Sequence, residues 1–278
     1  MVDGTFPASI SGQINKSECG YFKGRTCSSF LTSYELLKTS AASAESAENS
    51  IDVSGFYYTL LNNGFRRYSD FYYINDCEAC SECTPIRIHV KDFKPSKSQR
   101  AVWRKNQDIE VSLHKQVSAE ACPVDFVSAE KCALFRDYDY YHNGGEQGYS
   151  KMTLDEAARN LSQMVSGYSD VWNMEYRLDG KLIGVGVLDF AEGASGKKAL
   201  SSNYFYYDTS AETLKRSIGV FSVLKEIELC RLEGIEYYYL GLYLPGCRKM
   251  SYKANYKPYE LLLDGRWSVI CTYTKQRK

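Results

Sequence analysis

The chain has 278 residues, of which 44% are hydrophobic and 24% charged, so it is long enough for one large domain or two smaller ones. Its 34 lysines and arginines balance its 34 aspartates and glutamates, and this neutrality argues against non-specific binding to nucleic acid. No apolar run approaches the roughly 20 residues of a membrane-spanning helix and residues 1–50 lack a secretory signal pattern, so we expect a cytoplasmic protein with no membrane partner.

The N-terminal part contains a polar interruption between two structured stretches. The run "KTSAASAESAENS", from Lys38 to Ser50, is small, polar and low in complexity, which predicts an inserted loop or frayed helix. The stretch "YELL" before it and "FYYTLLNNGFRRYSDFYYI" after it predict a helix, a break at Gly64 and a tyrosine-rich strand. This strand is expected to end at a cluster of cysteines.

That cluster, "CEACSEC", has a cysteine at every third position, namely Cys77, Cys80 and Cys83. In a reducing compartment, thiols at metal-ligand spacing are better explained as ligands than as disulfides. Cys19, in "ECGYF", is the candidate for the fourth ligand of a tetrahedral zinc or iron–sulfur site. The usual second CxxC pair is missing, so unliganded reduced thiols remain the alternative.

A basic strand and helix follow the cysteines. "TPIRIHVKDF" alternates apolar residues with cations and His89, which predicts a strand with one positive, solvent-facing side that includes Arg87. Ser96 and Gln99 then form a capping-box pattern at the start of a helix. The cations of this helix are Lys97, Arg100, Arg104 and Lys105, and the first three share one face. Such a face predicts a phosphate or RNA-backbone site, with a merely solvated surface as the alternative.

The C-terminal half has the pattern strand, hairpin, strand, helix, strand. "WNMEYRLDGKLIGVGVLDF" contains a hairpin turn at "LDGK", and "SSNYFYYD", from Ser201 to Asp208, is a further strand. A long helix is expected from about Ser210 to Leu232, with Leu214 in its apolar stripe, before the strand "IEYYYLGLYL". This order predicts an α/β domain with a mixed sheet.

The start of that helix bears on the acyl donor. Arg216, Gly219 and Phe221 of "KRSIGVF" nearly match the loop with which acetyltransferases hold the pyrophosphate of acetyl-CoA. Phe221 takes the last small position of the loop, where a large ring would block close approach. We therefore expect an acyl donor other than acetyl-CoA. The three histidines are isolated in the sequence, so histidine chemistry is not expected.

Several blocks together carry a family resemblance. In chain order they are "CGYF", "NNGFRRYSDFYY", "CEACSECTPIRI", "FKPSKSQR", "FYYD", "SIGVFSVLKEIE", "YYYLGLYLPGCRKMSYKANYKPYELL" and "DGRW". From Cys19 to Trp267 the chain resembles the aminoacyl-tRNA–protein transferases. The resemblance is close to the bacterial aspartate/glutamate leucyltransferase branch and weaker to the arginyltransferase branch. Phe22, the CxxCxxC spacing and "DGRW" favour the leucyl branch, while an arginyl donor stays open.

The resemblance implies an enzyme that moves an amino acid from charged tRNA to the α-amine of proteins that begin with Asp or Glu, in the N-degron pathway of protein degradation. It implies an α/β fold in which an acetyltransferase-like (GNAT) mixed sheet, residues 116–278, packs against a Cys-containing α+β domain, residues 1–115. The implied partners are charged tRNA and acidic N-termini, and neither DNA nor a membrane. No cofactor is expected for the chemistry, apart from the structural zinc or iron–sulfur site.

Candidate residues for the acceptor follow from the resemblance and from side-chain chemistry. A bidentate arginine suits a carboxylate, so Arg66 and Arg67 are the first candidates to bind the acceptor's acidic side chain. Lys249 and Lys253 of "RKMSYK" are the second pair. Because adjacent residues of a strand point to opposite faces, one of the two arginines is expected to be structural.

The remaining candidates lie at strand and helix ends. Tyr207, Asp208 and Ser217 are the catalytic candidates, and Tyr206, Tyr239 and Tyr252 are further substrate-binding candidates. Tyr206, Tyr207 and Asp208 would position the amine and the tRNA 3′ adenosine by hydrogen bonding and stacking, with a plain aromatic core as the alternative for the tyrosines. The rival functions are an acetyl-CoA-dependent N-acetyltransferase and a non-catalytic, metal-stabilised RNA-binding protein.

Overall fold

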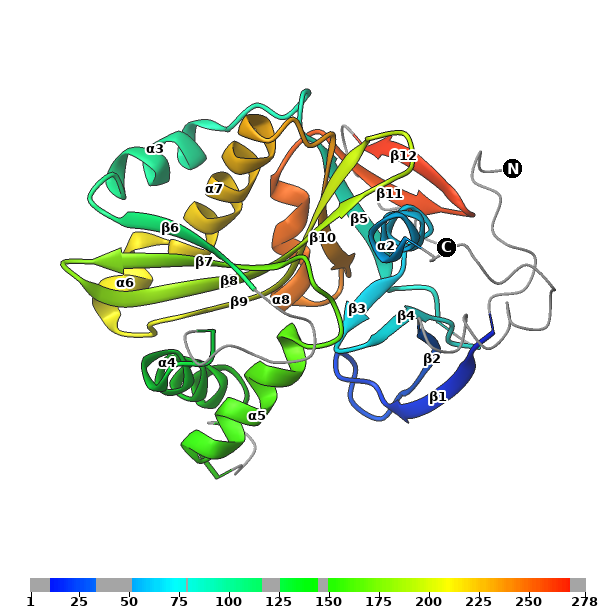
Figure 1. Ribbon diagram of the computed structural model, residues 1–278, viewed down its shortest axis with the longest axis horizontal. Coiled ribbons are helices and arrows are strands. Elements are labelled where there is room, and N and C mark those ends of the chain that lie inside the picture. The colour runs from blue at the N-terminus through cyan, green and yellow to red at the C-terminus, as the bar shows by residue number, and fades with distance from the viewer. Residues whose placement is uncertain (1–10, 34–51, 79, 117–125, 145–149, 271–278) are drawn as a thin grey trace. The chain divides into compact units, whose positions relative to one another are not determined.

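The computed structural model describes residues 11–33, 52–78, 80–116, 126–144 and 150–270 (Figure 1). The predicted polar insertion, residues 38–50, lies outside this set. The chain forms two compact units, one of residues 1–94, 191–201 and 235–278, the other of residues 95–190 and 202–234. These units are not consecutive along the chain, so the predicted sequential division after residue 115 stays a prediction.

The first unit contains a four-stranded antiparallel sheet that carries helix α2 (Val53–Asn62). The strands lie in the order β1 (Gln13–Glu18), β2 (Thr26–Ser33), β4 (Phe71–Asn75) and β3 (Arg66–Tyr68). The Asp52 side chain caps α2 by accepting from two backbone N–H groups, as a polar N-cap does. Tyr57 of the helix packs on Tyr72 of the sheet, 5.2 Å between ring centroids.

The predicted tyrosine-rich strand is wrong in one respect, because it is two strands rather than one. The chain turns at Ser69 and Asp70, where Ser69 has a φ of 57°, and Tyr68 pairs with Phe71 across the resulting hairpin. Polar residues that tolerate the left-handed region initiate such turns. The hairpin places Arg66 opposite Tyr73.

The same unit has a second group of strands around β5 (Thr84–His89). β5 is antiparallel both to β10 (Tyr237–Tyr243) and to β11 (Tyr259–Leu263), and β12 (Arg266–Ile270) extends the group beyond β11. Short helices α8 (Arg248–Ser251) and η2 (Tyr252–Asn255) join β10 to β11. Residues 199–201, at the start of β9 (Lys198–Tyr207), run parallel to β10.

The second unit is a layered sheet in the order β9-β8-β7-β6, with β8 at Lys181–Glu192, β7 at Val171–Leu178 and β6 at Glu110–Lys115. Helices α4 (Ala129–Asp139) and α5 (Leu154–Val165) lie on one face, and α3 (Lys97–Lys105) and α7 (Ile218–Leu232) on the other (Figure 1). The predicted hairpin is confirmed, since Asp179 and Gly180 both have positive φ between β7 and β8. The predicted mixed α/β fold class is likewise confirmed.

The predicted long helix from Ser210 to Leu232 is wrong as one element, because it is broken at Ser217. Ser217 has a φ of 56° and ends α6 (Ala211–Arg216) before α7 begins. The apolar spacing holds from Ile218 onward, whereas Leu214 is 37% exposed because the break takes it off the buried stripe. Within the described ranges, no helix has the length and apolar character that crossing a membrane requires.

Candidate functional site

Two cations of the first unit, the half-buried Arg66 and the buried Lys253, form the centre of the candidate site. Lys253, on η2, is buried and donates to the carbonyl oxygen of Leu242 at 2.8 Å. The Arg66 guanidinium, from β3, lies against the backbone of Gly241, where an added Cβ would be 1.7 Å from Nη1. The Nε of Arg66 is buried without a hydrogen-bond partner.

The electrostatics of this pair favour an anion. Burial lowers the pKa of Lys253 well below its ordinary value, and the charge of Arg66 lowers it further. Among the described residues, neither cation forms an ion pair with Asp or Glu. Two like charges without a carboxylate are costly to bury, and an incoming carboxylate would remove that cost through charge-assisted hydrogen bonds.

Strand β10 makes room for the arginine through an irregularity at Gly241. The register of β10 against β5 shifts between Tyr239 and Gly241, and Gly241 has a φ of +84°. Glycine adopts this conformation without the steric cost of a Cβ and leaves the strand backbone open to a neighbour. Parallel pairing of β10 with β9 ends at Tyr239, so Arg66 lies against β10 just beyond the last residue that pairs with β9.

The other acceptor candidates differ from Arg66 and Lys253 either in the strand face that they occupy or in their exposure. Arg67 points to the opposite face of β3, as predicted for adjacent strand residues, is buried and donates to the carbonyl oxygen of Ser69 at 2.7 Å; its structural role stays a prediction. Lys249 and Tyr252 are exposed, on α8 and at the start of η2. The geometry therefore brings together Arg66 and Lys253 of the four predicted cations.

Tyr239 belongs to a separate buried network around Arg87. Arg87 Nε donates to Glu260 Oε2 at 2.6 Å, and its Nη1 donates to Asn62 Oδ1 at 3.0 Å and to the Tyr239 hydroxyl at 3.1 Å. Its guanidinium lies 4.1 Å from the ring of Trp267. The predicted solvent-facing position of Arg87 is wrong, because partners from β10, β11 and β12 enclose it. A role for Tyr239 in binding substrate stays a prediction.

The residues predicted at the end of β9, Tyr206 for substrate binding and Tyr207 and Asp208 for catalysis, are in the second unit. Tyr206 is buried against Phe135, with ring centroids 5.5 Å apart. Asp208 forms an ion pair with Lys181 at 2.8 Å and accepts from the backbone N–H of Ser210 at 3.0 Å. Burial alone would raise the pKa of Asp208, but these partners lower it overall. Asp208 is thus held as a carboxylate that anchors the start of α6.

The residues that nearly match the coenzyme-binding loop make other contacts in the structure. Phe221 is buried at 5.8 Å from the ring of Trp103, so the expectation that its ring would block close approach to the loop is wrong: the first turn of α7 directs it into the core. Arg216 makes a two-pronged ion pair with Asp108, at 2.9 Å for each contact. Ser217 is exposed at the junction of α6 and α7.

Tyr207 is part of an aromatic cluster that the sequence did not indicate. The short π-helix η1 (Tyr140–Gly144) follows α4 and brings His142 to within hydrogen-bonding distance of the Tyr207 hydroxyl, 3.4 Å from its Nε2. Tyr138 packs on both, 4.4 Å from His142 and 4.9 Å from Tyr207 between ring centroids. Tyr141, beside them, is 54% exposed. π-helical turns are often found at functional sites, and this one places partly exposed rings where a base could stack.

The predicted RNA face is on the surface of the second unit. Ser96 and Gln99 form the predicted capping box at the start of α3, which is confirmed. Lys97, Arg100, Arg104 and Lys105 are all exposed on this helix. Lys105 donates to the carbonyl oxygen of Lys215 at the end of α6, so the cations continue from one helix to the next.

The thiols predicted as metal ligands share one small pocket in the first unit. It is lined by Cys19, Cys27, Cys77, Cys80 and Cys83, together with Arg25 and Phe22. Across the described ranges, no three His, Cys, Asp or Glu side chains are arranged as ligands of one metal ion. The donor chemistry suits a thiolate-bound metal, and the sequence missed Cys27 because it lies in a strand far from the CxxCxxC run.

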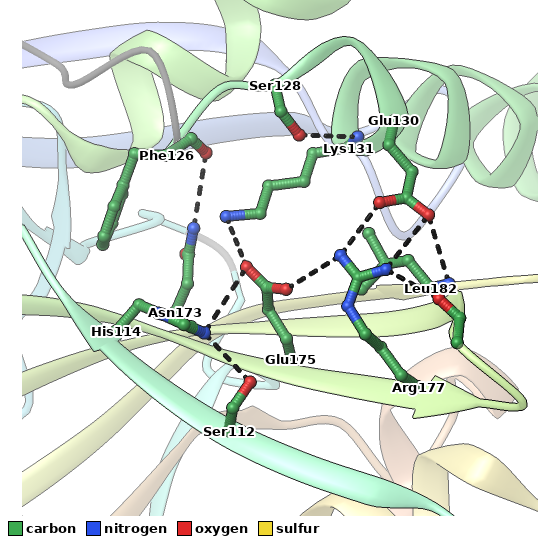
Figure 2. Close-up of polar contacts among 11 residues, drawn as sticks. Ser112, His114, Phe126, Ser128, Glu130, Lys131, Asn173, Glu175, Arg177 and Leu182 are labelled. Atoms are coloured by element: carbon green, nitrogen blue, oxygen red, sulfur yellow. Dashed lines mark hydrogen bonds and ion pairs between the residues drawn. The ribbon is translucent and has the colours of Figure 1, made fainter.

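A second feature that the sequence did not reveal is an ion network under α4, in which Lys131 and Glu175 are buried while Arg177 and Glu130 are partly exposed (Figure 2). Lys131 Nζ lies 2.8 Å from Glu175 Oε1, and Glu175 Oε2 lies 3.2 Å from Arg177 Nη2. Arg177 also binds both carboxylate oxygens of Glu130, which accepts from the backbone N–H of Leu182. These charges balance one another, so the network fixes α4 to the β7–β8 hairpin.

Comparison with known protein families gives a match to both parts of one family. Residues 17–101 match the model described as "Arginine-tRNA-protein transferase, N terminus", and residues 130–263 match "Arginine-tRNA-protein transferase, C terminus". An aspartate/glutamate leucyltransferase of Chromobacterium violaceum is 35% identical over 217 residues, 78% of this chain and 81% of that protein. One from Marinobacter nauticus is 33% identical over 220 residues, 78% of this chain and 83% of its own.

Solved structures show a weaker likeness. L-PGS from Bacillus licheniformis aligns at a TM-score of 0.43 and 11% identity, covering 76% of this chain and 62% of that one. A ribosomal-protein-alanine N-acetyltransferase from Brucella melitensis aligns at a TM-score of 0.27 and 13% identity, over 42% and 69% of the two chains. These likenesses are too low to bear on function.

Proposed function

Because the chain belongs to the aminoacyl-tRNA–protein transferase family and is an aminoacyltransferase, we propose that it transfers leucine from leucyl-tRNA to the α-amine of polypeptides that begin with Asp or Glu. The names of its relatives support leucine as the transferred amino acid, while the description of the matching family names arginine. Acetyl transfer from acetyl-CoA and RNA binding without catalysis are both disfavoured by this family membership.

The observation that carries the acceptor assignment is the half-buried Arg66, whose Nε is buried without a partner, together with the buried Lys253. An acceptor with Asp or Glu at its first position would supply the carboxylate that the described surroundings of these cations lack. The planar guanidinium can bind both carboxylate oxygens, and Lys253 adds a point charge. Asn and Gln have nearly the same shape but no charge, so we expect them to be rejected.

The chemistry then needs little beyond alignment. An aminoacyl ester is already activated, so the enzyme must hold it near the acceptor amine and stabilise the developing oxyanion. An α-amine has a pKa of about 7.7 to 8, so a substantial fraction is already neutral near pH 7.5. Once the first side chain is bound at Arg66, the amine of the same residue is fixed in space.

We propose that the second unit binds the tRNA. The exposed cations of α3 would contact phosphates, and the rings of Tyr207, His142 and Tyr141 would stack on the 3′ adenosine. Both Tyr207 and His142 have ring neighbours that hold them in place, as a stacking platform requires. A tRNA that lacks its terminal adenosine should therefore bind more weakly than the complete one, in a direct binding measurement.

The thiol pocket is proposed to hold a structural zinc or iron–sulfur site, with Cys19, Cys77, Cys80 and Cys83 as ligands and Cys27 as an additional thiol within the pocket. Bound metal would join the β1–β2 connection to the segment after β4. Metal analysis of the purified protein is the measurement that decides between this site and free thiols. The cytoplasmic location and the role in protein degradation stay predictions.

The proposed activity is tested by mixing the protein with labelled leucyl-tRNA or arginyl-tRNA and peptides that differ only in the first residue. We expect label on peptides that begin with Asp or Glu, from leucyl-tRNA, and none on matched peptides that begin with Asn or Gln. Transfer to all four peptides, or label from acetyl-CoA alone, would contradict the proposal.

Replacing Arg100 and Arg104 by alanine is expected to weaken tRNA binding and to reduce its salt dependence. Each lost phosphate contact lowers the slope of log affinity against log salt by roughly 1. The measurement is a series of tRNA binding curves between low and physiological salt. Glu110→Gln, at an exposed anion on β6, serves as the control and should leave the slope unchanged. An identical slope in the double variant would remove α3 from the RNA surface.

A further inference from the structure

We propose that the aromatic pair Tyr68 and Phe71 binds the side chain of the acceptor's third residue, and this inference rests on the proposed role of Arg66 in binding the first. The pair sits at the tip of the β3–β4 hairpin, where Tyr68 is directly opposite Phe71. Side chains alternate between the faces of a strand, so Arg66 and Tyr68 share a face and Arg67 takes the other. The charged and the aromatic sites therefore belong to one surface.

The two faces of this hairpin differ sharply in burial. Tyr68 is 47% exposed and Phe71 is 38% exposed, whereas Arg67 and Tyr72 on the opposite face are 4% and 1% exposed. The buried face is accounted for by packing on α2, where Tyr72 contacts Phe56 at 5.5 Å between ring centroids. On the other face, two aromatic side chains that are opposite each other both stay substantially exposed, and an exposed apolar patch of this kind favours a binding surface.

The direction of the acceptor follows from what surrounds Arg66. Toward the preceding residues, β3 enters the core, since Phe65 is 4% exposed and an added Cβ on Gly64 would be 2.6 Å from Leu262. Toward the following residues, the same face reaches the exposed rings of Tyr68 and Phe71. A chain whose first side chain is held at Arg66 thus has an open path along β3 toward the hairpin tip.

Strand geometry then selects the third residue. In an extended peptide, side chains two residues apart lie on the same side, roughly 6.6 Å apart, and the second side chain points away. Arg66 and Tyr68 have this same spacing along β3. An acceptor lying along the strand would place its first side chain at Arg66 and its third at the aromatic pair. Asp70, exposed in the turn, would repel an acidic third residue.

The experiment uses peptides of the form Asp-Ala-X that are identical beyond X, with X as Phe, Leu, Gly or Asp. The wild-type protein is expected to bind the Phe and Leu peptides about tenfold more tightly than the Gly peptide, as for partial burial of one large apolar side chain, and the Asp peptide most weakly. Binding is measured directly with fluorescent peptides, and transfer is measured in parallel. The preference should appear in affinity and KM, with kcat unchanged.

The variants separate this inference from the proposed function. Phe71→Ser and Tyr68→Ser should remove the preference for Phe and Leu while leaving affinity for the Gly peptide unaltered. Val269→Ser, at a residue that is 60% exposed on β12, is the matched control and should keep the preference. Equal affinity of the wild-type protein for the Phe and Gly peptides, or an undiminished preference in both hairpin variants, would overturn the inference. If the wild-type protein binds the Phe and Leu peptides preferentially but transfers no amino acid to any of the peptides, the proposed function is contradicted and this inference is not.

Discussion

Replacing Arg66 by Gln is expected to lower kcat/KM for peptides that begin with Asp or Glu by roughly 30-fold or more, because truncating one member of a buried charged contact costs about 2–5 kcal/mol. The residual transfer to peptides that begin with Asn or Gln should be unchanged or higher, since these have no charge to lose. The decisive quantity is therefore the ratio of kcat/KM for an Asp peptide to that for the matched Asn peptide.

Because of Lys253, the binding of an Asp peptide is expected to weaken as pH rises. Burial and then Arg66 lower the pKa of Lys253, so the unoccupied site loses its second charge at lower pH than an ordinary lysine would. A bound carboxylate favours the protonated form, so binding is tight below the lowered pKa and weakens as pH rises through it. KM for an Asp peptide should rise with pH in the wild-type protein, and Lys253→Met should abolish that rise.

The controls for this experiment come from the neighbouring cations. Lys249→Met removes a charge from exposed α8 and should leave the Asp-to-Asn ratio intact. Arg67→Gln removes the buried arginine of the opposite face, so it should reduce stability rather than selectivity. If Arg66→Gln keeps the wild-type ratio while it folds normally, the assignment of the acceptor site is wrong.

Replacing Lys131 by Met is expected to reduce the free energy of unfolding by about 3–5 kcal/mol, because it leaves the Glu175 carboxylate buried without its closest partner. Figure 2 shows that this pair connects α4 to β7 beneath the helix. The double variant Lys131→Met with Glu175→Leu removes both charges and should recover much of the loss. Chemical denaturation followed by circular dichroism measures both effects.

The exposed ion pair between Lys151 and Asp137 provides a matched control. Its side chains are 43% and 49% exposed, so Lys151→Met should cost less than about 1 kcal/mol. Acid should also reduce the stability that the Lys131–Glu175 pair provides. Burial alone would raise the pKa of Glu175, but Lys131 lowers it overall, so the stabilisation is complete above about pH 4.3 and is lost as pH falls through the lowered pKa. Equal losses in Lys131→Met and Lys151→Met would contradict this account.

Local patterns predicted the elements whose cause is local. The capping box of Ser96 and Gln99, the Asp179–Gly180 hairpin and the alternation of opposite faces at Arg66 and Arg67 depend on residues close in sequence, and all three are confirmed. The family could be recognised because long blocks of residues stand in a fixed order. None of these signals depends on knowing which strands become neighbours.

The errors arise where distant segments decide the outcome. Arg87 looked like a surface cation because its strand alternates, yet its partners Tyr239, Glu260 and Trp267 lie more than 150 residues away and enclose it. The proximity of Arg66 to Lys253 likewise depends on the irregularity of β10 at Gly241, which no local sequence pattern predicted. Sequence could supply the candidate cations but could not say which two meet.

The discontinuous first unit sets the order in which the protein can mature on the ribosome. Among the strands that the structure describes, β5 pairs with β10 and β11, which are synthesised roughly 150 residues or more after it. The nascent N-terminal segment must therefore emerge with β5 unpaired and stay so until β10 and β11 have been synthesised. Arg66, in that early segment, acquires its neighbours Gly241 and Lys253 only when these late residues have been made, so a chain terminated before β10 would present Arg66 without either of them.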